Sequence, residues 1–212
     1  MTVAINRVKQ DSVTAGQGKM AMRVSKEKAA ENRERILVAA ARLFRERGIS
    51  VGVDELASAA GMTHGSLYSQ FGSKDRLAAE ALRHALEGSA AKYRNVETLD
   101  AYARRYLTAR HRDMPGGGCA VAALGCDVPR AGGPMRRAFT EGLLRMVQRL
   151  SRLKRRRTRG AHEDEALAIA ATLVGGIVLA RAVDDAELSD RILVACRAAL
   201  AGSPSNGDSD AA

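Results

Sequence analysis

Residues 53–77 constrain the fold more than any other part of the chain, and they read VDELASAAGMTHGSLYSQFGSKDRL. Apolar residues recur at helical spacing up to Ala60, the run breaks at Gly61, and an apolar face resumes at Leu67 and Phe71. Two helices that meet at a sharp angle need such a break. The pattern therefore predicts two short helices around a glycine turn, which is the arrangement of a helix-turn-helix DNA reader.

Two polar residues mark where helices begin. Thr63 stands at the start of the second short helix, where its hydroxyl can accept from an otherwise unpaired backbone N–H group. Ser73 stands at the start of a further helix and is followed by Lys74 in the first turn. Because a helix N-terminus and an ammonium group both attract anions, this second start predicts a phosphate contact.

The second short helix carries the candidate DNA contacts. The N-terminal residues of a recognition helix meet base edges in the major groove, so we expect Thr63, His64 and Ser66 to face DNA. Gly65 has no side chain and would permit close approach. Tyr68 lies four residues after His64 on the same face, where its phenol can donate to a phosphate oxygen. The alternatives are that Tyr68 covers the core and that His64 is an ordinary exposed histidine.

Residues 32–86 resemble the N-terminal DNA-binding domain of the TetR/AcrR family of bacterial transcriptional repressors. The resemblance is carried by ERILVAAARLFRERG, VDELASAAGM, THGSLYSQF and GSKDRL. It implies an all-α fold, with an N-terminal three-helix helix-turn-helix DNA-binding domain and a C-terminal helical ligand-binding and dimerisation domain. It also implies a homodimer that binds palindromic operator DNA as a repressor and is released by a small-molecule effector.

The resemblance places the family's phosphate-contacting tyrosine and lysine at Tyr68 and Lys74. The chain departs from the family pattern at two places. Gly52 stands where the family often has a capping Ser or Thr, and Ser69 and Gln70 follow Tyr68 where a second aromatic residue or a histidine is common. These departures leave the operator sequence open.

The chain divides into four expected parts. Residues 1–24 are predicted to be a disordered basic tail that lies on DNA or is inert, and residues 202–212 a second disordered tail. Residues 25–88 form the DNA-binding domain with its connecting helix, and residues 89–201 the regulatory and dimerisation domain. Helices are expected at about 29–47, 74–88, 99–112, 120–126, 135–153, 163–182 and 187–201.

Composition narrows the class of protein. The 212-residue chain has a formal net charge of +10, which favours a polyanionic partner. Aromatic residues make up only 3% of it, so stacking platforms for single strands are hard to build and duplex DNA is favoured. We find neither an apolar run of about 20 residues nor a signal sequence, and the three cysteines fit a reducing compartment. The sequence therefore predicts a cytoplasmic protein without a membrane partner.

The positive charge is concentrated in the middle of the chain. Residues 87–159 carry 17 basic and 6 acidic side chains, and much of the surplus lies in residues 145–159. We interpret this run as a solvated helix end and loop, since cations are favourable at a helix C-terminus. The alternative is a second nucleic-acid patch.

The last two predicted helices are candidates for self-association. The helix at about 163–182 is apolar around much of its circumference and contains Gly175 and Gly176, so it must be covered on more than one side. We expect it to form a four-helix bundle between two copies together with the helix at about 187–201. A wholly intramolecular core is the alternative.

Gly/Pro breaks at residues 115–118 and 129–134, beside a helix that bears tyrosines, suggest a ligand cavity in the C-terminal domain. The candidate lining residues are aromatic or contain sulfur. They are Tyr102, Tyr106, Met114, Cys119, Cys126, Met135, Phe139 and Met146.

Other classes of function are less favoured. The four histidines, at positions 64, 84, 111 and 162, are scattered and no catalytic or metal-binding motif is present, so we expect no enzyme, cofactor or metal. A redox-responsive DNA-binding regulator that senses through Cys119 and Cys126 is the main alternative. A purely architectural DNA-binding protein is another, and it would lack both an effector and a preference for an operator.

Overall fold

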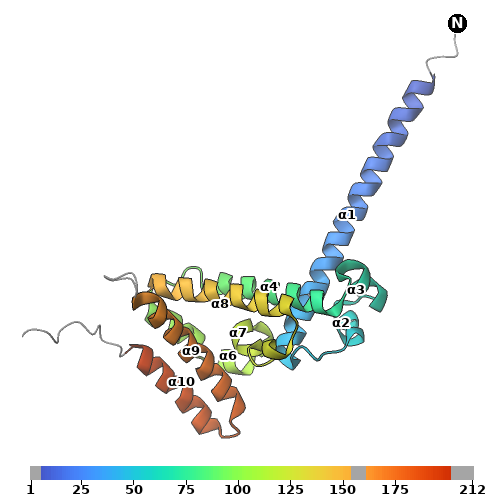
Figure 1. The fold of residues 1–212 in the computed structure, drawn as a ribbon. Coiled ribbons are helices and arrows are strands. Elements are labelled where there is room, and N and C mark those ends of the chain that lie inside the picture. Colours follow the sequence, from blue (N-terminus) through green and yellow to red (C-terminus); the bar gives the residue numbers. More distant parts are fainter. Residues whose placement is uncertain (1–5, 154–160, 202–212) are drawn as a thin grey trace, which may run out of the picture.

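The computed structural model describes residues 6–153 and 161–201, and within these ranges the chain forms helices and no strand (Figure 1). The all-α prediction is confirmed. The helices are α1 (Asn6–Arg47), α2 (Val53–Ala60), α3 (His64–Phe71), α4 (Lys74–Lys92), α5 (Leu99–Tyr106), α6 (Ala109–Asp113), α7 (Ala120–Leu124), α8 (Gly133–Leu153), α9 (Ala161–Ala182) and α10 (Ala186–Ala201), with 3₁₀ turns η1 (Pro115–Gly117) and η2 (Val128–Arg130).

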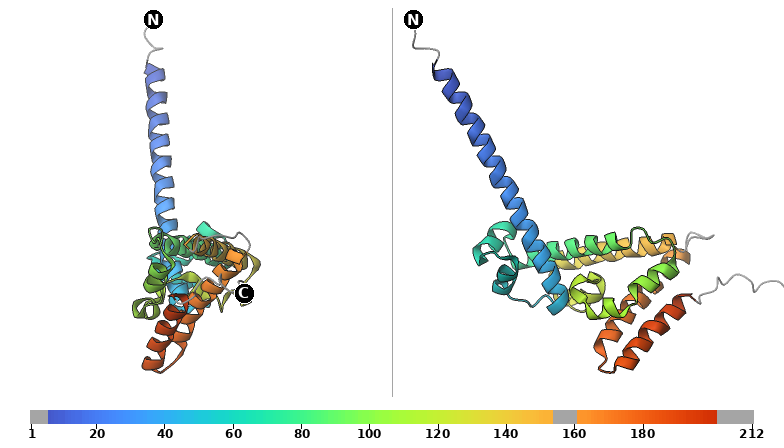
Figure 2. Two further views of the ribbon diagram at one scale, coloured as in Figure 1. Left: turned by 90° about the vertical axis from the view of Figure 1, so that its left-hand side faces the viewer. Right: turned by 180° about the vertical axis from the view of Figure 1, so that it is seen from behind.

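Helix α1 begins much earlier than the sequence analysis predicted. It is helical from Asn6, so the expectation of a disordered tail is wrong for residues 6–24. This segment contains no proline, and Gly16 and Gly18 each weaken a helix by only about 1 kcal/mol without breaking it. The N-terminal half of α1 projects away from the other helices (Figures 1 and 2). The expected tails at residues 1–5 and 202–212 lie outside the described residues.

The N-terminal domain is held together by a small apolar core. Ile36 and Phe44 of α1 are buried together with Leu56 of α2 and with Leu67 and Phe71 of α3. Helix α1 ends at Arg47, as the expected range of 29–47 predicted, and the following Gly48 stops the helix with a φ of 79°. Because α3 uses only its inner face for this core, its outer face is left for solvent.

Helix α4 joins this domain to the rest of the protein. It packs on α1 at one end and runs alongside α8 (Figures 1 and 2). It was expected to end near Gly88 but continues to Lys92, because a glycine inside a helix only lowers its stability. Helices α4 and α8 are in tight contact at Gly142, where Leu86 fills the space that a Cβ atom would occupy.

The single helix expected at about 99–112 is two helices, α5 and α6. Leu107 leaves the helical conformation, with φ −86° and ψ 72°, and Thr108 then starts α6 by accepting from the backbone N–H of His111 at 3.1 Å. A threonine hydroxyl competes with the helix for backbone groups, and here it forms an N-cap instead of continuing α5. The break turns the chain at the base of the cavity described below.

Helices α9 and α10 form an antiparallel pair that packs on α8 and α5 respectively. Within α9, residues Glu163–Ala182 are long and apolar enough to cross a membrane by length and composition, which the sequence analysis did not expect. The core helix of a soluble protein passes the same test. Leu173 and Ile177 on one side of α9 are fully buried in the core, whereas Leu167 and Leu179 on another side are exposed.

Candidate functional site

The N-terminus of α3 is built by Thr63, as predicted. Its backbone is extended, and its Oγ1 accepts from the backbone N–H of Ser66 at 3.3 Å. The hydroxyl groups of Thr63 and Ser66 also lie 2.9 Å apart, so the two side chains hold each other at the helix start. Both hydroxyls are therefore positioned before any DNA arrives.

The outer face of α3 carries the predicted contact residues. Thr63, His64 and Gly65 are exposed, and Tyr68 is 44% exposed, so the alternative that Tyr68 belongs to the core is wrong. The rings of His64 and Tyr68 stack with centroids 5.1 Å apart and planes 23° from parallel. Apart from the neighbouring residues and backbone of α3 itself, no atom of the described residues lies within 4 Å of the Cβ position of Gly65, so the helix surface is open there. The stacked pair forms one rigid aromatic edge on this face.

Asp54 at the start of α2 holds His64, and sequence reasoning missed this contact. The Nδ1 atom of His64 lies 2.6 Å from Oδ1 of Asp54. A carboxylate oxygen only accepts, so Nδ1 carries the proton and Nε2 is left as an acceptor. Asp54 stands ten residues before His64, and no local sequence pattern links the two positions.

A second group of donors lies at the start of α4. Ser73 caps the helix as predicted, since its Oγ accepts from the backbone N–H of Arg76 at 3.2 Å. The ammonium group of Lys74 is 3.5 Å from the carbonyl oxygen of Ser50, which is the long limit of a hydrogen bond. This loose contact keeps Lys74 beside the helix N-terminus and leaves its charge available to a phosphate.

Arg33 of α1 fixes the far end of α3. Its guanidinium donates to the carbonyl oxygen of Gln70 at 2.7 Å and pairs with Glu80 of α4. It also lies over the ring of Phe71, with Cζ 4.3 Å from the centroid. One side chain thus ties α1, α3 and α4 together, which sequence reasoning did not identify because the three partners are far apart in the chain.

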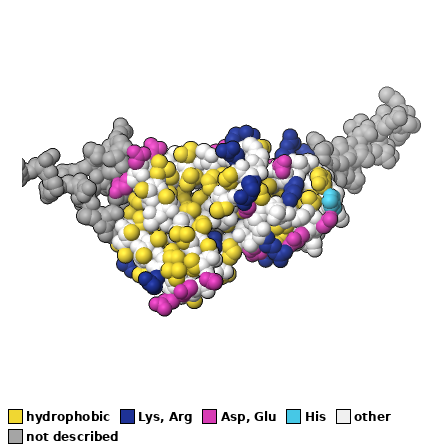
Figure 3. Space-filling view, turned by 60° about the horizontal axis from the view of Figure 1, so that its bottom comes forward, with side chains coloured by type: hydrophobic (Ala, Val, Ile, Leu, Met, Phe, Trp, Pro, Cys, Tyr) yellow, Lys and Arg dark blue, Asp and Glu magenta, His cyan; other side chains and the backbone are white. Residues whose placement is uncertain are grey.

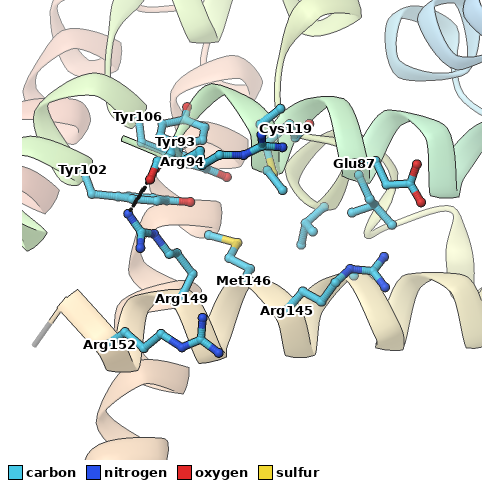
Figure 4. Close-up of a pocket in the computed structure, with 16 residues that line it drawn as sticks. Glu87, Tyr93, Arg94, Tyr102, Tyr106, Cys119, Arg145, Met146, Arg149 and Arg152 are labelled. Atoms are coloured by element: carbon cyan, nitrogen blue, oxygen red, sulfur yellow. Dashed lines mark hydrogen bonds between the residues drawn. The ribbon is translucent and has the colours of Figure 1, made fainter. Parts of the chain in front are cut away.

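The C-terminal domain contains a cavity of about 410 Å³ between α4, α5 and α8 (Figure 4). Four of the predicted lining residues are on its wall: Tyr102, Tyr106, Cys119 and Met146. The other four lie elsewhere. Met114 and Cys126 are exposed away from the cavity, Met135 borders a separate depression near Ala131, and Phe139 packs near Gly125.

Sequence reasoning missed the charged part of this wall. Arg94 follows α4, and Arg145, Arg149 and Arg152 line the cavity from α8 (Figure 4). The prediction that the basic run starting at residue 145 is a solvated helix end is confirmed for Arg145 and Arg152, which are exposed on the last part of α8, whereas Arg149 is half-buried. The expected loop at residues 154–160 lies outside the described residues. The spacing of the three α8 arginines, beside Met146, places them along one helix face and was a usable signal.

Three tyrosines form the opposite wall. The rings of Tyr93 and Tyr102 stack with centroids 4.5 Å apart, and the ring of Tyr106 lies 6.0 Å from that of Tyr102. Burial raises the pKa of Tyr93 to about 12, and burial also raises the pKa of Tyr102 and of Tyr106. All three phenols stay protonated at neutral pH and can donate hydrogen bonds.

His111 connects the segments beneath the cavity. Its Nδ1 lies 2.7 Å from the carbonyl oxygen of Tyr106, and its Nε2 accepts from the backbone N–H of Cys119 at 2.9 Å. Only the neutral ring with a proton on Nδ1 satisfies both contacts. Burial lowers the pKa of His111 to about 4, an effect that the charges of Arg181 and Lys92 increase. The ring is thus a neutral link between α5, α6 and α7.

The cysteines and acidic residues form no further site in the described part of the chain. Cys119, Cys126 and Cys196 are all free thiols, with Cys119 buried and Cys126 exposed. Burial raises the pKa of Cys196. Within residues 6–153 and 161–201, no group of three or more metal-ligating side chains is arranged to hold an ion.

Comparisons with known proteins agree with this geometry. Residues 36–81 match the family model for bacterial regulatory proteins of the TetR family. A stretch of 78 residues is 40% identical to the HTH-type transcriptional repressor KstR2 of Rhodococcus jostii (strain RHA1), and it covers 36% of this chain and 38% of that repressor.

Solved structures extend the likeness to most of the chain. The reduced form of E. coli NemR matches with a TM-score of 0.66 at 22% identity, covering 80% of this chain and 95% of that one. A TetR-family regulator from Cytophaga hutchinsonii matches with a TM-score of 0.68 at 22% identity, covering 82% and 96%. The chain therefore has the fold of the TetR-family regulators among these structures, and its residues 36–81 are similar to the DNA-binding domain of that family.

Proposed function

We propose that this regulator binds palindromic operator DNA as a homodimer and is released from it by a small molecule bound in the C-terminal domain. The observation that carries the proposal is the outer face of α3. Its capped N-terminus presents Thr63, His64 and Tyr68 to solvent, while Leu67 and Phe71 anchor the same helix in the core. A helix held in this way can enter the major groove end first. Such a function also requires a location in the cytoplasm.

Each exposed group has a distinct role in this proposal. Thr63, His64 and Ser66 read base edges, and Gly65 allows the helix to approach the groove closely. His64 points its Nε2 toward the bases because Asp54 holds its Nδ1. Tyr68 and Lys74 contact phosphates, and phosphate contacts position the protein without reading sequence.

Selection of bound duplexes from a random pool tests the proposal. We expect a palindrome whose half-sites are separated by about one helical turn of DNA or a multiple of it. With the selected duplex, Tyr68→Phe and Lys74→Gln should weaken binding to all sequences alike, whereas His64→Ala should change which half-site is preferred. Ser69→Ala is the matched control, because Ser69 is on the same helix and its hydroxyl donates to the carbonyl oxygen of Ser66 at 3.0 Å. Equal affinity for selected and random duplex would instead favour an architectural protein.

Self-association through α9 and α10 supplies the second recognition helix. Leu167 and Leu179 of α9 and Leu188 and Val194 of α10 are exposed large hydrophobic residues, and Val194 and Leu179 are more than half exposed. Hydrophobic side chains gather on this part of the surface, toward the lower left of the view in Figure 3. The Cβ position of Gly175 meets no atom of its own chain within 4 Å, so a helix of a second copy can approach closely there.

Sedimentation of paired variants tests this interface. Leu179→Glu and Val194→Glu should each shift the protein toward the single-chain mass, because a charge would be buried between two copies. Leu144→Glu, which changes an exposed leucine on α8, should leave the mass unchanged. A parent protein that sediments as one chain at all concentrations, or equal dissociation by Leu144→Glu, would contradict the proposed interface.

Release by an effector is proposed to act through α4. This helix lines the cavity with Leu86 and Glu87 and begins at the phosphate-contacting end with Ser73 and Lys74. A ligand with different affinities for two positions of α4 would shift the population between two spacings of the recognition helices.

A thiol sensor is the second candidate function. Cys126 favours it, because this sulfur is exposed and an oxidant can reach it. Peroxide should then weaken operator binding by the parent protein. The same loss in a variant with serine at both Cys119 and Cys126 would reject the thiol mechanism.

A further inference from the structure

The cavity between α4, α5 and α8 is strongly biased toward positive charge. Among the residues that the structure describes, Arg94, Arg145, Arg149 and Arg152 line it, and Glu87 is the one acidic residue on its wall. Within residues 6–153 and 161–201, none of these four guanidinium groups forms an ion pair, although other arginines of the protein do. Arg149 is half-buried, whereas Arg94, Arg145 and Arg152 are exposed. A partly desolvated cation attracts an anion more strongly than one on an open surface, and the three exposed cations add to the positive potential at the cavity.

Arg149 has an unsatisfied donor at this place. One of its terminal nitrogens donates to the carbonyl oxygens of Tyr93, Arg94 and Val96, which fixes the side chain against the end of α4 (Figure 4). Its Nε is buried and has no hydrogen-bond partner among the described residues. Among the described residues, the hydroxyl of Tyr106 is the other buried side-chain polar atom without a hydrogen-bond partner, and Tyr106 lines the same cavity. Buried polar groups without partners are rare and costly, so two at one cavity point to an absent partner.

The remainder of the cavity wall is apolar. Tyr93 and Tyr102 present stacked rings, and Met146 and Leu86 lie on the facing helices. The cationic groups line the cavity from α8 and from the end of α4, whereas the aromatic rings come from α5 and Tyr93, as Figure 4 shows. A ligand that fills such a space needs an apolar body and a charged end.

We propose that this cavity takes an amphipathic organic anion, whose negative group is bound by Arg145 and Arg149 and whose apolar body lies against Tyr102, Tyr106 and Met146. This inference rests on the proposed function, because it names the chemical class of the effector. The buried phenols of Tyr102 and Tyr106 add hydrogen-bond donors and supply no negative charge that would oppose the ligand.

Calorimetric titration with three probes of equal chain length tests the inference. Decanoate, decan-1-ol and decylamine share an apolar body and differ in the charge of the head group. The full-length protein should bind decanoate at least about tenfold more tightly than decan-1-ol, because hydrogen bonds to charged groups are the stronger class, and decylamine should bind most weakly. Equal affinities, preference for the amine, or no binding of decanoate would overturn the inference.

Three variants locate the head group. Arg149→Gln and Arg145→Gln should each remove most of the preference for decanoate over decan-1-ol. Arg145 forms no hydrogen bond within the described residues, so its replacement keeps the test decisive if Arg149→Gln fails to fold. Arg136→Gln changes an exposed arginine at the other end of α8 and should keep the preference. Preference retained in Arg145→Gln, or lost equally in Arg136→Gln, would refute the assignment.

Operator binding by the ligand-free protein separates this inference from the proposed function. A protein that binds its selected duplex and shows no head-group preference overturns the ligand class alone. A protein that binds decanoate with the expected preference but has no preferred duplex overturns the proposed function and leaves the ligand class standing.

Discussion

The buried neutral state of His111 makes the stability of the C-terminal domain depend on pH. In the unfolded chain the ring has the ordinary pKa of 6.5, whereas burial in the folded protein lowers its pKa to about 4. The unfolded chain therefore binds a proton more tightly than the folded protein between these values. Stability falls as pH decreases from about 6.5, and the fall ends near pH 4, where the folded protein binds the proton as well.

The size of this effect follows from the difference between the two pKa values. At about 1.4 kcal/mol for each pKa unit, the full change is about 3 kcal/mol. Near pH 5.2 the unfolded ring is almost fully protonated and the folded ring almost fully neutral, so the free energy of unfolding should change by about 1.2 kcal/mol per pH unit. Protonation of Nε2 would also break the hydrogen bond from the backbone of Cys119.

Urea unfolding followed by circular dichroism between pH 4 and pH 7.5, at one fixed protein concentration, measures this slope. His111→Gln should lower the free energy of unfolding at pH 7.5, and between pH 4.5 and 6 it should remove about 1.2 kcal/mol per pH unit from the slope of the parent protein. His84→Gln, at a partly exposed histidine on α4, should keep the steep slope of the parent. Identical slopes for the parent and His111→Gln would refute the reasoning.

Two further changes test the packing of α4 and the start of that helix. Gly142→Ala should reduce stability by about 1–3 kcal/mol because the new Cβ would overlap Leu86, whereas Gly88→Ala should raise stability by about 0.5–1 kcal/mol because its Cβ meets open space in a helix. Thermal unfolding of both variants checks the contrast, and equal shifts would contradict it. Ser73→Ala should cost about 1 kcal/mol through loss of the N-cap, and Ser73→Thr should restore most of it. A Ser73→Thr variant as unstable as Ser73→Ala would show that the cap is unimportant.

Features that depend on neighbouring residues were predictable from the sequence. Gly61 adopts the left-handed conformation that the turn requires, with φ 63°, and Thr63 and Ser73 both cap the helices that follow them. The capping hydrogen bonds join residues three apart, so the chain near each position is enough to specify them. The same local reasoning failed at two places. The sequence near Asn6 permits either a helix or an irregular tail, and the segment continues α1. The sequence near Thr108 permits either one continuous helix or two, and Thr108 caps a second helix, α6.

The sequence by itself determined an all-helical chain, the helix-turn-helix with its exposed outer face on α3, and the apolar pattern of the last two helices. Only the tertiary structure decided which side chains share the cavity, that Asp54 contacts His64, and that Arg33 binds the C-terminal end of α3. The physical reason is distance along the chain: helical period and caps are fixed within a few residues, whereas these contacts join residues 10 to 56 positions apart. The neutrality of His111 likewise depends on burial by segments that the chain brings back from far away.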